Sequence, residues 1–137
     1  MRLWHYKLIP VLPKKMLVSQ WRECIAIKRQ WEKNGITNSL RLVTYIKDYD
    51  KNYFVAYTLQ VVAELENRNI KYNKKLWTEI LTMTNGNFSG NDYLEHNDRY
   101  LTQCYYNLQE KYDRGIINKE EWQKIHEYYV EIMTERN

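Results

Sequence analysis

The chain has 137 residues, of which 44% are hydrophobic and 28% are charged. This length and composition fit one globular domain with a sizeable core and exclude a disordered chain. No apolar run reaches the length of a membrane-spanning helix and the first residues lack the apolar stretch of a secretion signal, so we expect a cytoplasmic protein without membrane contact. Cys24 and Cys104 form no CxxC pair, which indicates buried free thiols.

Charge is divided unevenly along the chain. Residues 1–75 carry 15 Lys and Arg against 6 Asp and Glu, a net charge of +9, whereas residues 76–137 carry 6 against 11, a net charge of −5. A basic half is typical of proteins that bind nucleic acid, because Lys and Arg gain affinity when phosphates release counterions. A solvated basic surface that keeps the protein soluble is the alternative, and charge alone favours it.

The first predicted elements are an arm and a long helix. Residues 1–12 lack a helical period, and Pro10 and Pro13 interrupt any helix there, so we expect an extended arm packed on the globule. Pro13 suits the first turn of a helix that runs to about Lys33 and ends at Asn34-Gly35. Apolar residues recur on one face of this helix at Leu17, Val18, Trp21, Cys24, Ile25, Ile27 and Trp31.

Five further helices are expected, at about residues 39–47, 51–67, 73–83, 98–115 and 118–132. The helix over 51–67 carries the most apolar residues and is the most buried candidate. Asn73 opens the next helix, and Asn97 or Asp98 caps the one after it. Asn118 with Glu121 three residues later has the spacing of a capping box.

These elements predict an all-α fold, a single compact domain of about five to six helices with an extended N-terminal arm packed on the globule. Its parts are the arm (1–12), a basic helical half (13–84) and an acidic helical half (85–137). No internal repeat or low-complexity tract interrupts the chain. We expect a monomer.

Glu23 is the only carboxylate in the first 31 residues, where it is surrounded by basic residues. The neighbours that share its helix face are Ser19, Gln20, Ala26 and Ile27. Two of them are small, so the carboxylate should lie in a shallow, accessible dent. Arg22 is about 100° around the helix and could face the same cleft. The alternative is an ordinary surface carboxylate balanced by Lys28 or Lys15.

A second chemical group is the α-amine of Met1, which we expect to be retained because Arg2 is bulky. An unperturbed α-amine has a pKa of about 7.7–8.0, and surrounding cations disfavour its charged form. A neutral amine is a nucleophile toward a sugar carbon, and a carboxylate opposite it can move protons during glycosidic cleavage. An ordinary frayed terminus is the alternative.

The run MRLWHYKLIPVLP, followed by LVSQWRE, resembles the pyrimidine-dimer DNA glycosylase (endonuclease V) family of phages and bacteria. The resemblance rests on Met1-Arg2, on the Leu-Ile-Pro segment and on Trp21-Arg22-Glu23. A weaker similarity continues from Tyr53 to Asn69, so about half of the chain is covered. Members are small all-α enzymes that excise damaged pyrimidines and nick the resulting abasic site.

The resemblance implies a DNA repair N-glycosylase with abasic-site lyase activity, acting in a bacterial cell or a phage-infected host. It implies that the α-amine of Met1 forms a Schiff base at C1′ and that Glu23 assists base loss and β-elimination. Arg2 and Arg22 would hold phosphates around a kinked duplex with a flipped nucleotide. The expected partner is double-stranded DNA with a damaged pyrimidine or an abasic site, and no cofactor is expected.

Other candidate residues lie on the arm and the first helix. His5 lies beside the proposed amine and is a possible site residue, with a packing role as the alternative. The histidines are too scattered to predict a metal site. The family's aromatic C-terminal tail is missing, and Tyr105-Tyr106 or Tyr128-Tyr129 are possible substitutes. The remaining candidate DNA contacts are Lys14, Lys15, Lys28 and Arg29.

Two other functions stay open at this point. One is a non-catalytic nucleic-acid- or protein-binding member of the same fold that interferes with host nucleic-acid enzymes, with its acidic half docked on a basic surface. The other is an enzyme that acts on an undamaged, modified base. Blocking the N-terminal amine separates catalysis from pure binding.

Overall fold

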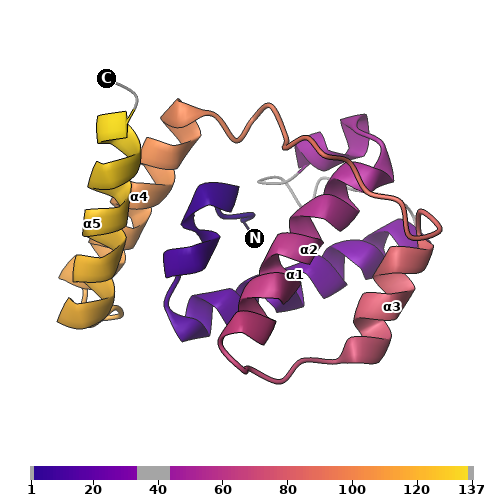
Figure 1. The fold of residues 1–137 in the computed structure, drawn as a ribbon, viewed down its shortest axis with the longest axis horizontal. Coiled ribbons are helices and arrows are strands. Elements are labelled where there is room, and N and C mark those ends of the chain that lie inside the picture. Colours follow the sequence, from indigo (N-terminus) through magenta and orange to yellow (C-terminus); the bar gives the residue numbers. More distant parts are fainter. Residues whose placement is uncertain (1, 34–43, 136–137) are drawn as a thin grey trace.

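The structure is a computed structural model that describes residues 2–33 and 44–135. Helices account for its regular elements in these ranges, and no strand occurs among them (Figure 1), so the predicted all-α class is confirmed. The elements are the 3₁₀ helix η1 (Tyr6–Val11), α1 (Lys14–Lys33), α2 (Lys51–Asn67), α3 (Lys74–Thr82), α4 (Asp98–Asp113) and α5 (Lys119–Glu135).

The N-terminal arm packs into the globule as predicted, but it is not extended throughout. Its residues Tyr6–Val11 form η1, with His5 as N-cap accepting the Lys7 N–H at Nδ1 over 3.1 Å. Pro10 interrupts an α-helix, yet a short 3₁₀ helix needs fewer backbone hydrogen bonds and tolerates it. The apolar residues of the arm are buried, namely Leu3, Trp4, Leu8, Ile9, Val11 and Leu12.

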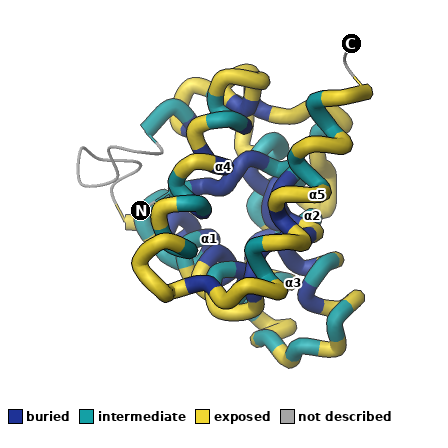
Figure 2. The backbone as a smooth tube through the Cα atoms, turned by 90° about the vertical axis from the view of Figure 1, so that its left-hand side faces the viewer, coloured by how far each residue is buried: buried dark blue, intermediate teal, exposed yellow. Residues whose placement is uncertain are grey.

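The arm lies at the centre of the molecule. Figure 1 shows η1 between the α4–α5 hairpin on one side and α1 and α2 on the other, and η1 contacts both α2 and α5. In Figure 2 the buried positions lie in the interior and the exposed ones along the outer faces of the helices. Phe54, Val61 and Leu65 of α2 are almost fully buried, which confirms this helix as a major part of the core.

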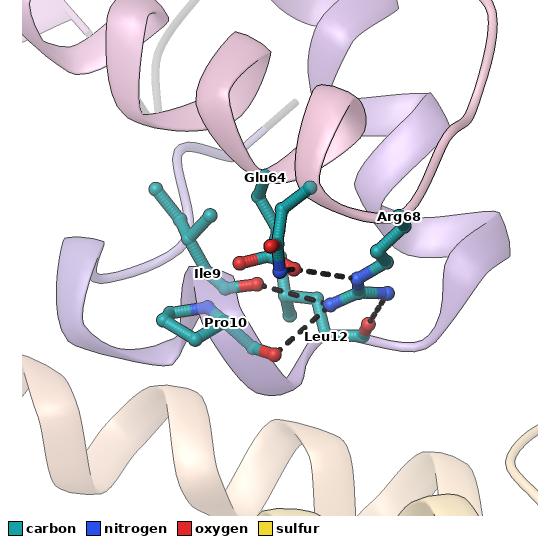
Figure 3. Close-up of polar contacts among 6 residues, drawn as sticks. Ile9, Pro10, Leu12, Glu64 and Arg68 are labelled. Carbon is teal, nitrogen blue, oxygen red and sulfur yellow. Dashed lines mark hydrogen bonds and ion pairs between the residues drawn. The ribbon is translucent and has the colours of Figure 1, made fainter.

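Arg68 fastens the arm to the end of α2 (Figure 3). Its guanidinium donates to the carbonyls of Leu12 at 2.7 Å, Pro10 at 3.0 Å and Ile9 at 3.4 Å. Its Nε also pairs with Glu64 at 2.8 Å. Carbonyls at the end of a helix have no partner within it. A single side chain therefore satisfies several of these acceptors and fixes the path of the arm.

Local signals at the helix ends are confirmed. The side chains of Asn73 and Asn97 each accept a backbone N–H in the first turn of α3 and α4. Asn118 and Glu121 form the predicted capping box, with reciprocal hydrogen bonds of 3.0 and 2.8 Å. Of the helix expected at 39–47, residues 39–43 lie outside the described ranges, and residues 44–48 form a 3₁₀ turn.

The α4–α5 hairpin is held together by aromatic side chains. Tyr105 is buried and stacks on Tyr129 with ring centroids 3.9 Å apart, so these two rings pack between helices.

Cys24 and Cys104 are buried and free, as expected. Across residues 2–33 and 44–135, every helix is too short or too polar to span a bilayer.

Candidate active site

A cavity of about 270 Å³ opens where the arm, α1 and α4 meet. Glu23 lies in its wall, so the predicted dent around this carboxylate is present. The arm and α1 are neighbours in sequence, whereas α4 comes from the far end of the chain. The lining residues are Arg2, Trp4, Met16, Ser19, Glu23, Asn107 and Lys111.

Glu23 is half-buried and is hydrogen-bonded to the start of the arm. Its Oε2 accepts the backbone N–H of Arg2 at 3.0 Å and the amide Nε2 of Gln20 at 3.3 Å. Burial raises the pKa of the Glu23 carboxyl, and these two hydrogen bonds oppose the shift. No ion pair joins Glu23 to Lys15 or Lys28 within the described ranges. The balanced surface carboxylate considered above is therefore not what the structure shows.

Gln20 holds the arm in place beneath Glu23. It is almost fully buried, its Oε1 accepts the N–H of Trp4 at 2.8 Å, and its Nε2 donates to the carbonyl of Arg2 at 3.0 Å. The hydroxyl of Tyr57 donates to the Trp4 carbonyl at 2.6 Å. Sequence analysis noted Gln20 only as a neighbour of Glu23. The available signal was a polar amide one turn from the apolar residues Leu17 and Cys24.

Several predicted DNA contacts share one surface of α1. Lys14, Lys15 and Arg22 are exposed and line a second hollow, of about 540 Å³. A third hollow, of about 350 Å³, shares Met16 with the Glu23 cavity and both lysines with the second hollow. The third hollow therefore adjoins each of the other two. Arg29 is exposed seven residues beyond Arg22, so it continues the same face of the helix.

The other predicted DNA contacts lie differently. Arg2 is half-buried in the wall of the Glu23 cavity, with its guanidinium carbon 5.5 Å from the centre of the Trp4 ring. Lys28 is buried and forms an ion pair with Glu32. A phosphate contact by Lys28 stays a prediction, and its position gives that role no support.

His5 belongs to a buried cluster outside the Glu23 cavity. Its ring stacks on His96 with centroids 5.4 Å apart, and His96 accepts the Tyr6 N–H at Nδ1 over 3.3 Å. Burial lowers the pKa of His5 to about 4 and that of His96 to about 3. These contacts favour the packing role for His5. The described residues include no group of three or more His, Cys, Asp or Glu placed to hold a metal.

Met1 lies outside the described residues, so its predicted role as nucleophile stays a prediction. The atom nearest to it in the chain is the backbone nitrogen of Arg2. That nitrogen faces the Glu23 carboxylate, as given above. The part of the predicted site that the structure describes is thus the carboxylate and the backbone that leads to the amine.

Cations clustered along one face of a helix, as on α1, are the electrostatic footprint of a protein that binds nucleic acid. The family model for pyrimidine dimer DNA glycosylase matches residues 1–79, which is more than half of the chain. The chain therefore belongs to the pyrimidine dimer DNA glycosylase family, and this family implies a DNA substrate. Searches of the curated proteins and of the solved structures gave no significant match.

Proposed function

We propose that this protein excises damaged pyrimidines from double-stranded DNA and then cuts the strand at the abasic site. The α-amine of Met1 is the nucleophile and Glu23 is the acid–base residue. The observation that carries the proposal is the 3.0 Å hydrogen bond from the Arg2 N–H to Glu23, in a cavity open to solvent. It ties the first peptide of the chain to a carboxylate.

Covalent geometry supports the pairing of amine and carboxylate. The α-nitrogen of any residue lies within roughly 4 Å of the next residue's nitrogen. With the Arg2 nitrogen 3.0 Å from Oε2 of Glu23, bond lengths alone limit the distance from that oxygen to an α-amine one residue earlier to roughly 7 Å. A sugar carbon bound between the two groups would be within reach of both.

The proposed reaction has two stages. The lone pair of the amine forms a bond to C1′ while the bond from C1′ to the pyrimidine breaks, and the base leaves with that electron pair and a proton. The C1′–O4′ bond then breaks as the nitrogen lone pair forms the C1′=N bond of the Schiff base, and O4′ takes a proton from Glu23. Removal of a proton from C2′ expels the 3′ phosphate, and water releases the enzyme. Because burial raises its pKa, the Glu23 carboxylate is a stronger base than an exposed glutamate and suits these proton transfers.

The exposed face of α1 supplies the DNA contacts in this proposal. Lys15, Arg22 and Arg29 are spaced seven residues apart on one face and span roughly 21 Å along the helix axis. At a rise of 3.4 Å per nucleotide, this is roughly six nucleotides of one strand. Contacts of this kind offset the cost of flipping a nucleotide toward the Glu23 cavity.

A trapping experiment tests the proposal. Incubation with an abasic duplex and borohydride should give a covalent adduct, and peptide mapping should place it at Met1. A matched sample in which the α-amine of Met1 is acetylated should bind the duplex but give no adduct. The absence of an adduct with the intact chain would overturn the proposal. Duplex binding by both forms without any adduct would instead indicate the non-catalytic alternative.

A further inference from the structure

The backbone of residues 2–4, at the start of the arm, is held by side chains from three helices. Gln20 bonds it from α1, Tyr57 from α2 and Tyr100 from α4. We propose that Tyr100 is a positioning residue for the N-terminal amine, because its hydroxyl fixes the Leu3 carbonyl two residues from that amine. This inference rests on the function proposed above. It gives α4 a part in catalysis, although this helix lies outside the family match.

The bond from Tyr100 completes the attachment of the arm. Gln20 donates to the Arg2 carbonyl at 3.0 Å and accepts the Trp4 N–H at 2.8 Å. The Leu3 carbonyl lies between these two groups in the chain and accepts the Tyr100 hydroxyl at 2.6 Å. Consecutive groups of one short backbone segment are thus bonded to α1 and to α4. Bonds to two different helices fix both the position and the direction of this segment.

Tyr100 is itself held in place, so it can fix the arm. Its backbone N–H donates to the side chain of Asn97, the N-cap of α4, at 2.9 Å. Its ring lies against that of His96, with centroids 5.1 Å apart. Burial raises the pKa of the Tyr100 hydroxyl, which therefore stays protonated and remains a donor at neutral pH. A side chain presented from a rigid helix is positioned more reproducibly than one on a loop.

The link from Tyr100 to the chemistry runs through the backbone of the arm. Next to Leu3 toward the N-terminus is Arg2, whose N–H bonds Glu23 at 3.0 Å. The residues that line the Glu23 cavity do not include Tyr100, so it acts by holding this backbone. A displacement of about 1 Å between reacting groups can lower a rate by about 10²-fold. We therefore expect Tyr100 to affect the chemical step more than DNA binding.

The test compares Tyr100→Phe with Tyr112→Phe, which removes the same hydroxyl from a tyrosine of α4 that stacks on Trp122 within the hairpin. With an abasic duplex and borohydride at saturating protein, Tyr100→Phe should lower the single-turnover rate of adduct formation about tenfold. The Kd of the duplex should change by less than about twofold, because the exposed cations of α1 are unaltered. Tyr112→Phe should change neither quantity.

The outcomes separate positioning from the proposed function and from a purely structural role. If the intact chain gives no adduct, the proposed function fails. If the intact chain is active and Tyr100→Phe forms the adduct as fast as Tyr112→Phe, or loses only DNA affinity, the positioning role is wrong. Thermal melts set an assay temperature at which both variants are folded.

A second replacement keeps the donor at this position. With 4-aminophenylalanine in place of Tyr100, the ring remains and an amino group can donate to the Leu3 carbonyl. This protein should recover most of the rate of adduct formation. A folded protein of this kind that reacts as slowly as Tyr100→Phe would show that the hydrogen bond to the arm is not what matters.

Discussion

The family-matched part of the chain and the α4–α5 hairpin contribute differently to the molecule. The matched part holds Glu23, the buried Gln20 and the exposed cations of α1 within a short stretch of sequence. The hairpin has a net negative sequence and lies against the arm, but it places Lys111 in the same cavity. The chemical groups are thus local in sequence, whereas the cavity around them is closed by a region that the family model does not cover.

The arm belongs to the matched part and lies between α1 and the hairpin. Hydrogen bonds join it to both sides. On the α1 side, Gln20 holds the backbone of residues 2 and 4. On the other side, the hydroxyl of Tyr100 donates to the Leu3 carbonyl at 2.6 Å, and His96 accepts the Tyr6 N–H. Changes on either side of the arm therefore test how far activity and stability depend on each part.

The largest effect is expected on strand cleavage, for Glu23→Gln in the matched part. Loss of the acid–base group should lower strand cleavage of an abasic duplex by about 10²–10⁴-fold. The pKa of Glu23 is raised in the folded protein, so ionisation at neutral pH opposes folding, and the variant should melt at the same or a higher temperature at pH 7. Glu79→Gln, which removes an exposed carboxylate of α3 in the same matched part, is the control. Unchanged cleavage by Glu23→Gln would remove this residue from the mechanism.

The second largest effect is the loss of stability in acid, at the contact between His5 of the matched part and His96, which lies just before the hairpin. Burial lowers the pKa of His5 to about 4 and that of His96 to about 3. An unfolded histidine has a pKa of about 6.5, so below this pH the unfolded chain binds protons that the folded chain does not. The stability that the two neutral histidines contribute is fully present above about pH 6.5 and is lost as the pH falls toward the folded pKa values, by on the order of 3–5 kcal/mol for the pair at pH 4.5.

Urea unfolding at pH 7, 5.5 and 4.5 measures this loss. The variant His96→Gln should start less stable at pH 7 but lose less stability on acidification than the unaltered chain. His126→Gln, at an exposed position on α5, is the matched control. An equal pH dependence in all three proteins would show that the buried pair does not control acid stability.

These comparisons show which features the sequence could predict. Asn73, Asn97 and the Asn118–Glu121 box marked helix starts correctly, because capping depends on residues a few positions apart. Glu23 was found because its isolation among cations is visible in the sequence. The sequence does not predict the 3₁₀ conformation of η1, because Pro10 excludes an α-helix there but is tolerated in a short 3₁₀ helix.

The missed site residues depend on long-range packing. Gln20 acts on the arm, and that contact exists only once the arm lies along α1. Lys111 resembles any other lysine of an amphipathic helix until α4 lies against the cavity. Neither residue belongs to a short motif. A single sequence therefore indicated the carboxylate but not the groups that position and surround it.

Gln20→Met should have the next largest effect on stability. It keeps a similar volume but leaves the buried Trp4 N–H and the Arg2 carbonyl without their partner, at a cost of about 2–4 kcal/mol in the free energy of unfolding. The displaced arm should also lower the yield of borohydride adduct. Gln103→Met, at an exposed position on α4, should change neither quantity. A normal adduct yield in Gln20→Met would mean that this amide does not position the N-terminus.

The smallest effects on the free energy of unfolding are expected for two arginine substitutions, one in each part. Arg68 bonds three arm carbonyls and Glu64, and its side chain is 20% exposed, so Arg68→Ala should lower the free energy of unfolding by about 1.5–3 kcal/mol. Arg114 forms an exposed pair with Glu110 at 3.8 Å, and Arg114→Ala should change stability by no more than about 0.5 kcal/mol. Urea unfolding at pH 7 measures both. Equal losses would show that the bonds of Arg68 to the arm add nothing beyond an ordinary surface ion pair.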